Sequence, residues 1–211
     1  MNTRRRGFTL VELMIVVVIL GILAAIAIPL YMKFVQQSKT GEAEANLAKI
    51  ASLVEQHYAK SGSQAASGTV IPGGTMLLVS KFPNTTRTAT CAGGAGNPRT
   101  NGESVPRPAS TASVQKASYQ PAINEWSCSS PAAGCTADTA WSQMKFEISS
   151  PIRYVYCYEA NVTDPANQRF TVYATGDLDG DGVWSEWQRQ GISNADGAVT
   201  VGPMGVVNED E

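Results

Sequence analysis

Histidine is nearly absent from this sequence, since only His57 occurs among 211 residues. The chain also lacks a G-x-S-x-G turn, an H-E-x-x-H pair and a glycine-rich phosphate loop. Each of these motifs places a nucleophile, a metal ion or a phosphate group where a reaction needs it. Without them the sequence offers no candidate catalytic centre, and we expect a protein that is not an enzyme.

An excess of charge of one sign is also missing, because 16 basic and 18 acidic residues give a formal net charge of −2. This balance gives no general attraction for a polyanion, so we expect no nucleic-acid partner. One basic cluster, Arg4-Arg5-Arg6, nevertheless stands directly before an apolar run. Lys and Arg are retained on the cytoplasmic side of membranes, so the cluster predicts a cytoplasmic N-terminus.

Cysteine is scarce and lies only in the later part of the chain, without a C-x-x-C pair. The four cysteines are Cys91, Cys128, Cys135 and Cys157. With a single distant histidine, a zinc site has little support. An even number of cysteines beyond a membrane segment favours two disulfides formed in an oxidising compartment, with three possible connectivities. Unpaired buried cysteines are the alternative.

From Phe8 to Ile28 the only ionisable side chain is Glu12. As a helix, this run of about 20 residues is long enough to cross the hydrocarbon core of a membrane. A carboxylate inside such a segment is costly and marks a functional position whose partner has to be found.

The run RRRGFTLVELMIVVVILGILAAIAIP resembles the N-terminal signal of type IV pilins and of the pseudopilins of type II secretion. The resemblance implies cleavage between Gly7 and Phe8 by a prepilin peptidase, N-methylation of Phe8, and retention of the hydrophobic helix. It places Glu12 at the family's glutamate and Pro29 at its helix-kink proline. The match covers roughly residues 1 to 45 and does not extend recognisably over the rest of the chain.

Cleavage before Phe8 would create an α-amino group at the same end of the helix as Glu12. In a bundle of staggered helices, this amine can meet the Glu12 carboxylate of a neighbour and neutralise it. The resemblance implies the same pairing, used to set the register during filament assembly. The alternative is that Glu12 only reaches towards the lipid headgroups.

After Pro29 the pattern becomes amphipathic, which predicts one continuous helix from Phe8 to about Lys60. One apolar face at helical spacing is formed by Phe34, Leu47, Ile50, Val54 and Tyr58. The breaker residues Ser61-Gly62-Ser63 are expected to end this helix. Only its second half is expected to pack on a globular head.

The head is predicted to contain loops over residues 61–140, which are rich in Ser, Thr, Ala, Gly and Pro, followed by strands. The strand predictions are Met144–Ile148, Arg153–Glu159 and Gln168–Thr175, with a final hairpin of Ala198–Val201 and Met204–Val207. The fold class is therefore α+β, with a long N-terminal helix packed on a small antiparallel sheet, as the resemblance also implies. The four tryptophans are expected mainly as core aromatics, with surface anchors as the alternative.

The predicted organisation has four parts. They are a leader peptide (1–7), a transmembrane and filament-core helix (8–30), an amphipathic helix (31–60) and a globular α+β head (61–211).

An acidic segment, Asp177-Leu178-Asp179-Gly180-Asp181-Gly182, resembles the first half of an EF-hand calcium loop. Alternate carboxylates in a tight turn can converge on one Ca²⁺ ion, which prefers hard oxygen ligands. The candidate ligands are Asp177, Asp179, Asp181, the Val183 carbonyl, Ser185 and Glu186. The twelfth position of the template is Gln188 instead of a glutamate, and an acidic turn without metal is the alternative.

These features predict a structural subunit, major or minor, of a type IV pilus. A pseudopilin of a type II secretion system is the alternative within the family, and a membrane-anchored adhesin or binding module is one from another class. The expected partners are copies of the chain or related pilins in a filament, the prepilin peptidase, an inner-membrane assembly platform and membrane lipid. The expected location is the bacterial inner membrane, single-pass with a cytoplasmic N-terminus, and then an extracellular pilus or a periplasmic pseudopilus.

Overall fold

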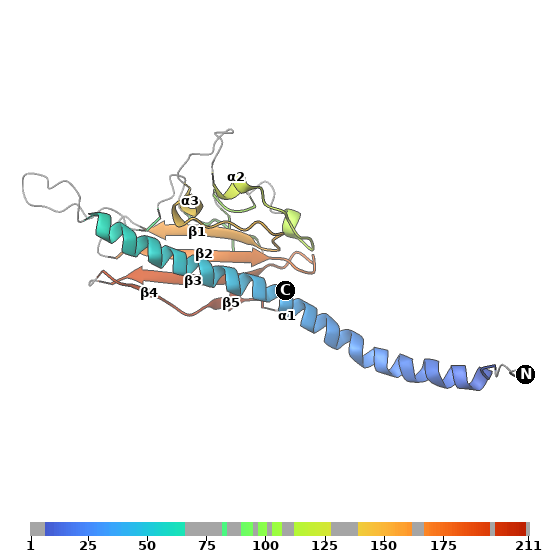
Figure 1. Cartoon of the computed structure of the whole chain (residues 1–211). Coiled ribbons are helices and arrows are strands. Elements are labelled where there is room, and N and C mark those ends of the chain that lie inside the picture. The colour runs from blue at the N-terminus through green and yellow to red at the C-terminus, as the bar shows by residue number, and fades with distance from the viewer. Residues whose placement is uncertain are drawn as a thin grey trace, which may run out of the picture. The chain divides into compact units, whose positions relative to one another are not determined.

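The computed structural model contains a long N-terminal helix and a five-stranded antiparallel sheet (Figure 1). It describes residues 7–65, 82–83, 90–94, 97–100, 103–106, 112–127, 139–161, 167–194 and 197–209. The chain divides into two compact units, Met1–Lys39 and Thr40–Glu211. The predicted α+β class, with a long helix and a small sheet, is confirmed.

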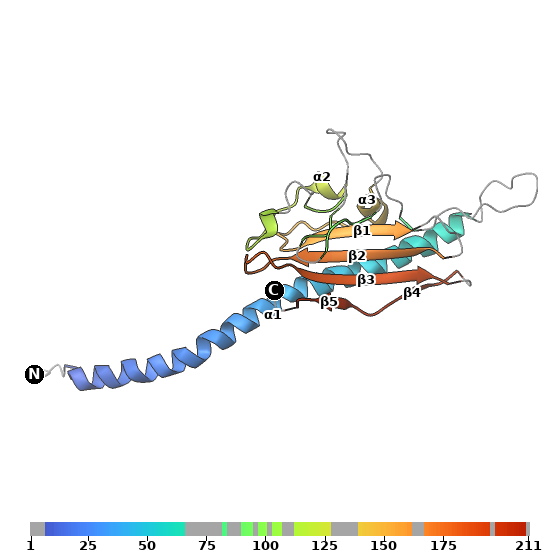
Figure 2. The ribbon, with the colours of Figure 1, turned by 180° about the vertical axis from the view of Figure 1, so that it is seen from behind.

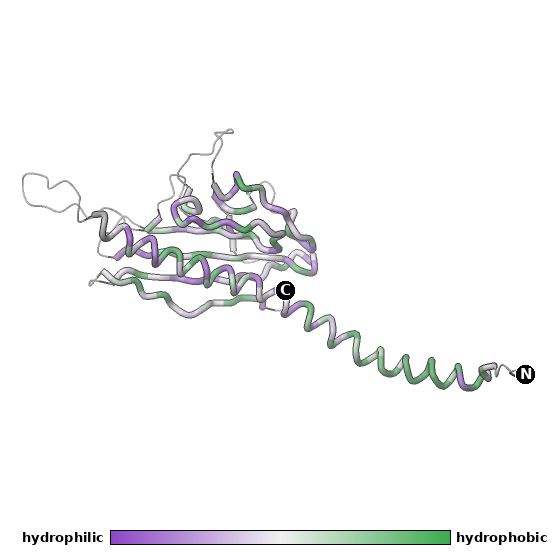
Figure 3. Tube along the Cα trace, in the orientation of Figure 1, coloured by the Kyte–Doolittle hydropathy of each residue, from purple (hydrophilic) through white to green (hydrophobic). Residues whose placement is uncertain are grey.

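Helix α1 spans Leu10–Ala65 and continues through Pro29. It ends a few residues beyond the predicted Lys60, because a single glycine such as Gly62 weakens a helix without necessarily ending it. In the first unit its large apolar side chains are exposed on all sides, and Figure 3 shows this stretch as almost uniformly hydrophobic. Within the described residues, α1 alone is long and apolar enough to cross a membrane.

In the second unit, α1 buries one face in the core of the head. The buried positions recur at intervals of three and four residues: Ala43, Leu47, Ile50, Ala51, Val54 and Tyr58. This spacing confirms most of the predicted apolar face, since residues three and four apart share one side of a helix. Phe34 does not belong to it, because its side chain is 69% exposed in the first unit.

The sheet consists of β1 (Val155–Asn161), β2 (Arg169–Gly176), β3 (Ser185–Ser193), β4 (Val199–Val201) and β5 (Gly205–Val207). Its order is β1-β2-β3-β4, and β5 also pairs with β3. The two strands predicted around residues 153–159 and 168–175 are confirmed as β1 and β2, each shifted by one or two residues.

The predicted C-terminal hairpin is wrong, although both of its strands exist. β4 pairs with Gly191–Ser193 and β5 pairs with Glu186–Gln188, so both run antiparallel to β3 as two pieces of one edge strand. Between them the Gly202 amide donates to the Gln190 carbonyl at 2.8 Å, and the chain then passes through Pro203. Proline has no amide hydrogen, so it interrupts the ladder instead of turning the chain back.

One face of the sheet packs against the second half of α1, as the opposite views of Figures 1 and 2 show. Alternate residues of β1 and β2 point to this side and are buried there, among them Tyr156, Tyr158, Phe170 and Val172. Aromatic rings form a continuous part of this core. Successive centroid distances are 4.7 Å for Tyr58–Phe82, 5.3 Å for Phe82–Phe170, 6.2 Å for Phe170–Tyr158, 6.3 Å for Tyr158–Trp141 and 5.3 Å for Trp141–Trp126.

All four tryptophans are buried, which confirms the core interpretation. Two of them lie on short helices, Trp126 on α2 (Ile123–Trp126) and Trp141 on α3 (Ala140–Met144). The strand predicted at Met144–Ile148 is wrong, because its first residue belongs to α3 and the rest is not a strand. Lys145, in a left-handed conformation with φ 55°, ends the helix.

The opposite face of the sheet is covered by a segment held by a disulfide between Cys91 and Cys157. Cys157 lies on β1, and the register places it beside Tyr173 of β2. One disulfide is therefore confirmed. Cys128 and Cys135 lie outside the described residues, so the second predicted disulfide stays a prediction.

A polar cluster joins α1 to the start of β1. The Glu42 carboxylate accepts hydrogen bonds from the Arg153 amide at 3.0 Å and from the Tyr156 hydroxyl at 3.3 Å, and its second oxygen lies 3.5 Å from the Arg153 guanidinium. Asn46 donates to the Tyr156 hydroxyl oxygen at 2.7 Å. Burial raises the pKa of Tyr156 well above its usual value, so its hydroxyl stays protonated and remains a donor. This cluster orients the helix on the sheet through directional bonds.

The buried face of α1 generates a stability prediction. Replacing Ile50, which is fully buried, by alanine is expected to lower the free energy of unfolding by about 2–5 kcal/mol, because it leaves a cavity between helix and sheet. The same substitution at Ile123, whose side chain is 65% exposed, serves as the matched control and should change stability far less. Thermal or denaturant unfolding of the two variants measures the difference. Equal losses would contradict the packing described for α1.

Candidate functional site

The start of α1 carries the predicted processing bond. Gly7, Phe8 and Thr9 precede the helix in non-helical backbone. Phe8 is 85% exposed, and a side chain placed on Gly7 would meet no atom within 4 Å. Within the described part of the chain, nothing therefore blocks a peptidase from the Gly7–Phe8 bond.

Glu12 caps the first turn of the same helix together with Thr9. One carboxylate oxygen of Glu12 accepts hydrogen bonds from the Thr9 amide at 2.9 Å and from the Thr9 hydroxyl at 2.8 Å. The Thr9 hydroxyl oxygen in turn accepts from the Glu12 amide at 3.3 Å. This is a reciprocal capping box, in which two amides of the first turn that lack helical partners are satisfied.

Thr9 was not among the predicted site residues, although threonine followed three residues later by glutamate before an apolar run is the sequence signal of a capping box. The box uses only Thr9 and Glu12, so removal of residues 1–7 leaves both partners in place. It points the Glu12 carboxylate at the helix N-terminus, where the positive end of the helix dipole favours a negative charge.

Beyond this turn, α1 presents an uninterrupted apolar surface. A side chain added at Gly21 would meet no atom within 4 Å, and small alanines follow at positions 24, 25 and 27. Small residues allow close approach of a neighbouring helix in an apolar environment. Pro29 lies inside the helix and removes one of its backbone hydrogen bonds.

The acidic loop follows β2 and turns on two glycines with positive φ, Gly180 at 80° and Gly182 at 93°. Oxygens of Asp177, Asp179 and Asp181 all lie within 4.8 Å of one another. Ligands on opposite sides of a Ca²⁺ ion are about 5 Å apart, so one ion fits between these oxygens.

Asp177 is fully buried and fixed by the backbone of its own loop. Its oxygens accept from the Gly180 amide at 2.6 Å, the Gly182 amide at 3.1 Å and the Gln115 side chain at 3.2 Å. Asp179 and Asp181 are exposed, and each accepts a hydrogen bond from the amide two residues later, Asp181 from that of Val183 at 2.7 Å. The loop is therefore preformed by local hydrogen bonds that leave other lone pairs of the carboxylates available.

Ser185 and Glu186 do not join the three aspartates, because both belong to β3. The Ser185 hydroxyl donates to the Gly176 carbonyl at 2.9 Å. Successive strand residues point to opposite faces, and Glu186 consequently turns to the outer face, where it pairs with Arg99 at 2.8 Å. This hydrogen bond raises the pKa of Arg99, with partial burial opposing it.

Comparison with known proteins identifies the N-terminal segment. Residues 2–28 match the model of the prokaryotic N-terminal methylation motif. The type IV major pilin protein PilA of Myxococcus xanthus is 67% identical over 46 residues, which are 22% of this chain and 21% of that protein. The N-terminal region is that of a type IV pilin.

Other pilins match longer stretches. The fimbrial protein of Neisseria meningitidis serogroup A is 41% identical over 69 residues, or 33% of this chain and 41% of that protein. The type IV major fimbrial protein FimA of Dichelobacter nodosus is 37% identical over 97 residues, or 46% of this chain and 62% of that protein. The matches thus span between about a fifth and three fifths of these pilins. No solved structure matches the chain.

The pilin motif includes Gly7, Phe8, Thr9 and Glu12, which the structure brings together at one helix end. The acidic loop and the outer face of the sheet lie far beyond the matched motif. For the acidic loop and the outer face, only the geometry of the fold indicates what they could bind.

The capping box generates a prediction for this chain. Thr9→Val preserves shape but removes the hydroxyl, and the first turn should lose about 1 kcal/mol, whereas Thr9→Ser should retain most of it. Amide hydrogen exchange of the detergent-solubilised protein at Glu12 and Leu13, whose amides donate to the Thr9 hydroxyl and carbonyl, measures the effect, with exchange about fivefold faster expected in the valine variant. Equal exchange in the valine and serine variants would contradict the described bonds.

Proposed function

We propose that this chain is a structural subunit of a type IV pilus, processed between Gly7 and Phe8 and assembled through α1. The observation that carries the proposal is an exposed apolar helix of membrane-spanning length that begins directly at a pilin processing motif. The names of its relatives, major pilins and fimbrial proteins, support the same role. The role is structural and not enzymatic.

Before assembly, the first half of α1 lies in the inner membrane with its N-terminus in the cytoplasm. Lipid covers the apolar side chains there, and the basic residues Arg4 to Arg6 hold the leader on the cytoplasmic side. Prepilin peptidase removes residues 1–7 and methylates Phe8. An inner-membrane assembly platform then transfers the subunit into a filament, where helices of other copies or related pilins replace the lipid.

Glu12 guides this transfer. Its carboxylate is already held at the helix N-terminus by Thr9, which donates to one of its two oxygens, and the other oxygen is available to a partner from a neighbouring copy. In the filament the methylated α-amine of a neighbouring copy pairs with this carboxylate and neutralises it. Because a charge buried among apolar helices is costly without a partner, only the register that makes this pair is favoured.

The proposal is tested by deleting the gene and complementing the strain with variants. Glu12→Ala is expected to reduce surface filaments at least tenfold, because no carboxylate then selects the register. The matched control is Glu44→Ala, an exposed glutamate on the same helix outside the apolar run, which should assemble normally. Electron microscopy and immunoblots of sheared filaments give the readout.

Normal filaments in the Glu12→Ala strain would remove the register role. If the deletion strain keeps its surface pili but retains secreted proteins in the periplasm, the chain is instead a pseudopilin of a type II secretion system. If neither filaments nor secretion change and only attachment is lost, the chain is a membrane-anchored adhesin or binding module.

We also propose that the acidic loop binds one structural Ca²⁺ ion. The proximity of the Asp177, Asp179 and Asp181 oxygens supports this, because three carboxylates so close together repel one another without a cation. The Val183 carbonyl and water would complete the ligand set. Bound calcium would supply a fixed positive charge that holds the connection between β2 and β3.

Calcium binding should raise thermal stability. The expected gain is about 2.7 kcal/mol at a hundredfold excess over Kd, and each kcal/mol shifts Tm by roughly 2–4 °C in a protein of this size. Asp179→Asn combined with Asp181→Asn should abolish the shift. Glu44→Gln combined with Glu147→Gln removes the same charge from exposed positions elsewhere and should preserve it. Identical melting with calcium and with excess chelator in the unmodified protein would refute the site.

A further inference from the structure

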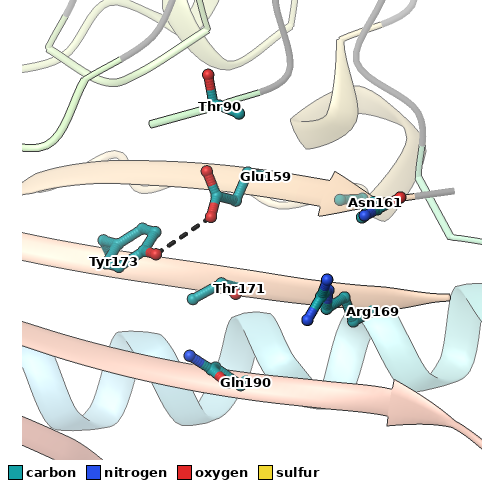
Figure 4. Close-up of a pocket in the computed structure, with 8 residues that line it drawn as sticks. Thr90, Glu159, Asn161, Arg169, Thr171, Tyr173 and Gln190 are labelled. Atoms are coloured by element: carbon teal, nitrogen blue, oxygen red, sulfur yellow. Dashed lines mark hydrogen bonds between the residues drawn. The ribbon is translucent and has the colours of Figure 1, made fainter. Parts of the chain in front are cut away.

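A polar groove lies on the outer face of the sheet, the face opposite α1. Its volume is about 530 Å³, and its lining comes from Thr90 and from β1, β2 and β3: Glu159, Ala160, Asn161, Arg169, Thr171, Tyr173 and Gln190 (Figure 4). Pockets for small molecules usually measure about 300–1,000 Å³ and are mostly apolar. The size of this groove is typical, and seven of the eight described residues that line it carry polar groups, which suits a ligand rich in hydrogen-bonding groups.

One end of the groove is already fixed by internal bonds. Glu159 accepts from the Tyr173 hydroxyl at 3.1 Å and from the Cys91 amide at 2.7 Å. Burial, and next the nearby Glu159 charge, raise the pKa of Tyr173 to about 12, so its hydroxyl remains a donor at neutral pH. The guanidinium of Arg99 covers the Tyr173 ring at 4.6 Å, and the ring is only 7% exposed. The polar groups at this end of the groove therefore bond to one another and are not available to a ligand.

Arg169 lies at the other end of the groove, and its charged group is not used in an ion pair with the described residues. Its side chain is exposed and makes no ion pair with any residue in the part of the chain that the structure describes. It also borders a second hollow of about 250 Å³, lined by Asn167, Gln168, Ile192 and Ser193. The guanidinium therefore stands between two adjoining hollows, with the Gln190 amide on the next strand (Figure 4).

We propose that this groove binds an acidic saccharide, with Arg169 holding a sugar carboxylate. The planar guanidinium fork matches a carboxylate with two parallel hydrogen bonds. Gln190 and Thr171 provide an amide and a hydroxyl for the ring hydroxyl groups, and Ile192 in the adjoining hollow offers an apolar contact for a sugar's C–H face. The groove is a recognition site of the head and does not depend on the proposed role in filaments.

The position of the groove favours a saccharide over a peptide. It lies on the face of β1, β2 and β3, where the backbone amides and carbonyls of β2 are used in pairing with both neighbours. An extended peptide gains most of its affinity by pairing with an open strand edge, whereas the central strand β2, which carries Arg169, has its backbone already paired on both sides. A ligand in this groove would therefore be bound by side chains, which suit a ligand whose polar groups project from a ring.

The test uses the full-length protein in detergent and two trisaccharide probes, trigalacturonate with carboxylates and maltotriose without them. Titration calorimetry should give a Kd for trigalacturonate at least tenfold lower than for maltotriose, since hydrogen bonds between ionised groups are stronger than those between neutral groups. Arg169→Gln should remove that difference. Arg169→Lys, which keeps the charge but loses the fork, should lie between the two.

Lys145→Gln is the matched control, because it removes one exposed positive charge away from the groove and should leave binding unchanged. Unchanged Tm of each variant confirms that the fold is intact. Equal affinity for both probes, or unchanged trigalacturonate binding by Arg169→Gln, would overturn the proposal. Equal or tighter binding of triglutamate would do so as well, and would assign the groove to an acidic peptide.

Discussion

The apolar surface of α1 in the first unit is the constraint on which the rest depends. From Phe8 to Phe34 the large apolar side chains are exposed around the whole circumference of the helix. Water cannot cover such a surface without a large free-energy cost, because about 25 cal/mol are lost for each Å² of apolar area left exposed. An apolar partner, such as lipid or other helices of the same kind, would remove this cost, and the proposed assembly would exchange one apolar environment for another.

In the proposed assembly, the polar groups at the start of α1 would make that exchange selective. Apolar helices alone attract one another with little preference for register, whereas a carboxylate among them has to find a cation or a donor. Thr9 satisfies part of this requirement within the subunit, and its hydroxyl orients the Glu12 carboxylate. The head contributes rigidity through a different set of bonds, in which Glu42 ties α1 to Arg153 and Tyr156.

The N-terminal helix could be predicted from the sequence because it depends only on residues close to one another in the chain. Length, apolarity and one charge define the helix, and the buried positions Leu47, Ile50 and Val54 follow from its period. β1 and β2 were predicted because β-branched and aromatic residues dominate them.

β3 was missed for an identifiable reason. Its outward residues Glu186, Gln188 and Gln190 are polar, and the calcium template extended over its first half. Periodicity could have found it, since Trp187 points inward and Gly191 must be small where it meets the Phe170 ring. The groove could not be predicted at all, because only the register brings Asn161, Arg169 and Ile192 to one end of the sheet.

The edge of the sheet formed by β4 and β5 affects how the protein behaves at high concentration. In the proposed function, the chain is stored in a membrane next to identical copies, where an open strand edge would invite them to add to one another's sheets. Here β4 and β5 have only three residues each, and Pro203 removes a donor between them. Addition of further strands at this edge, a common route to aggregates, is thereby discouraged.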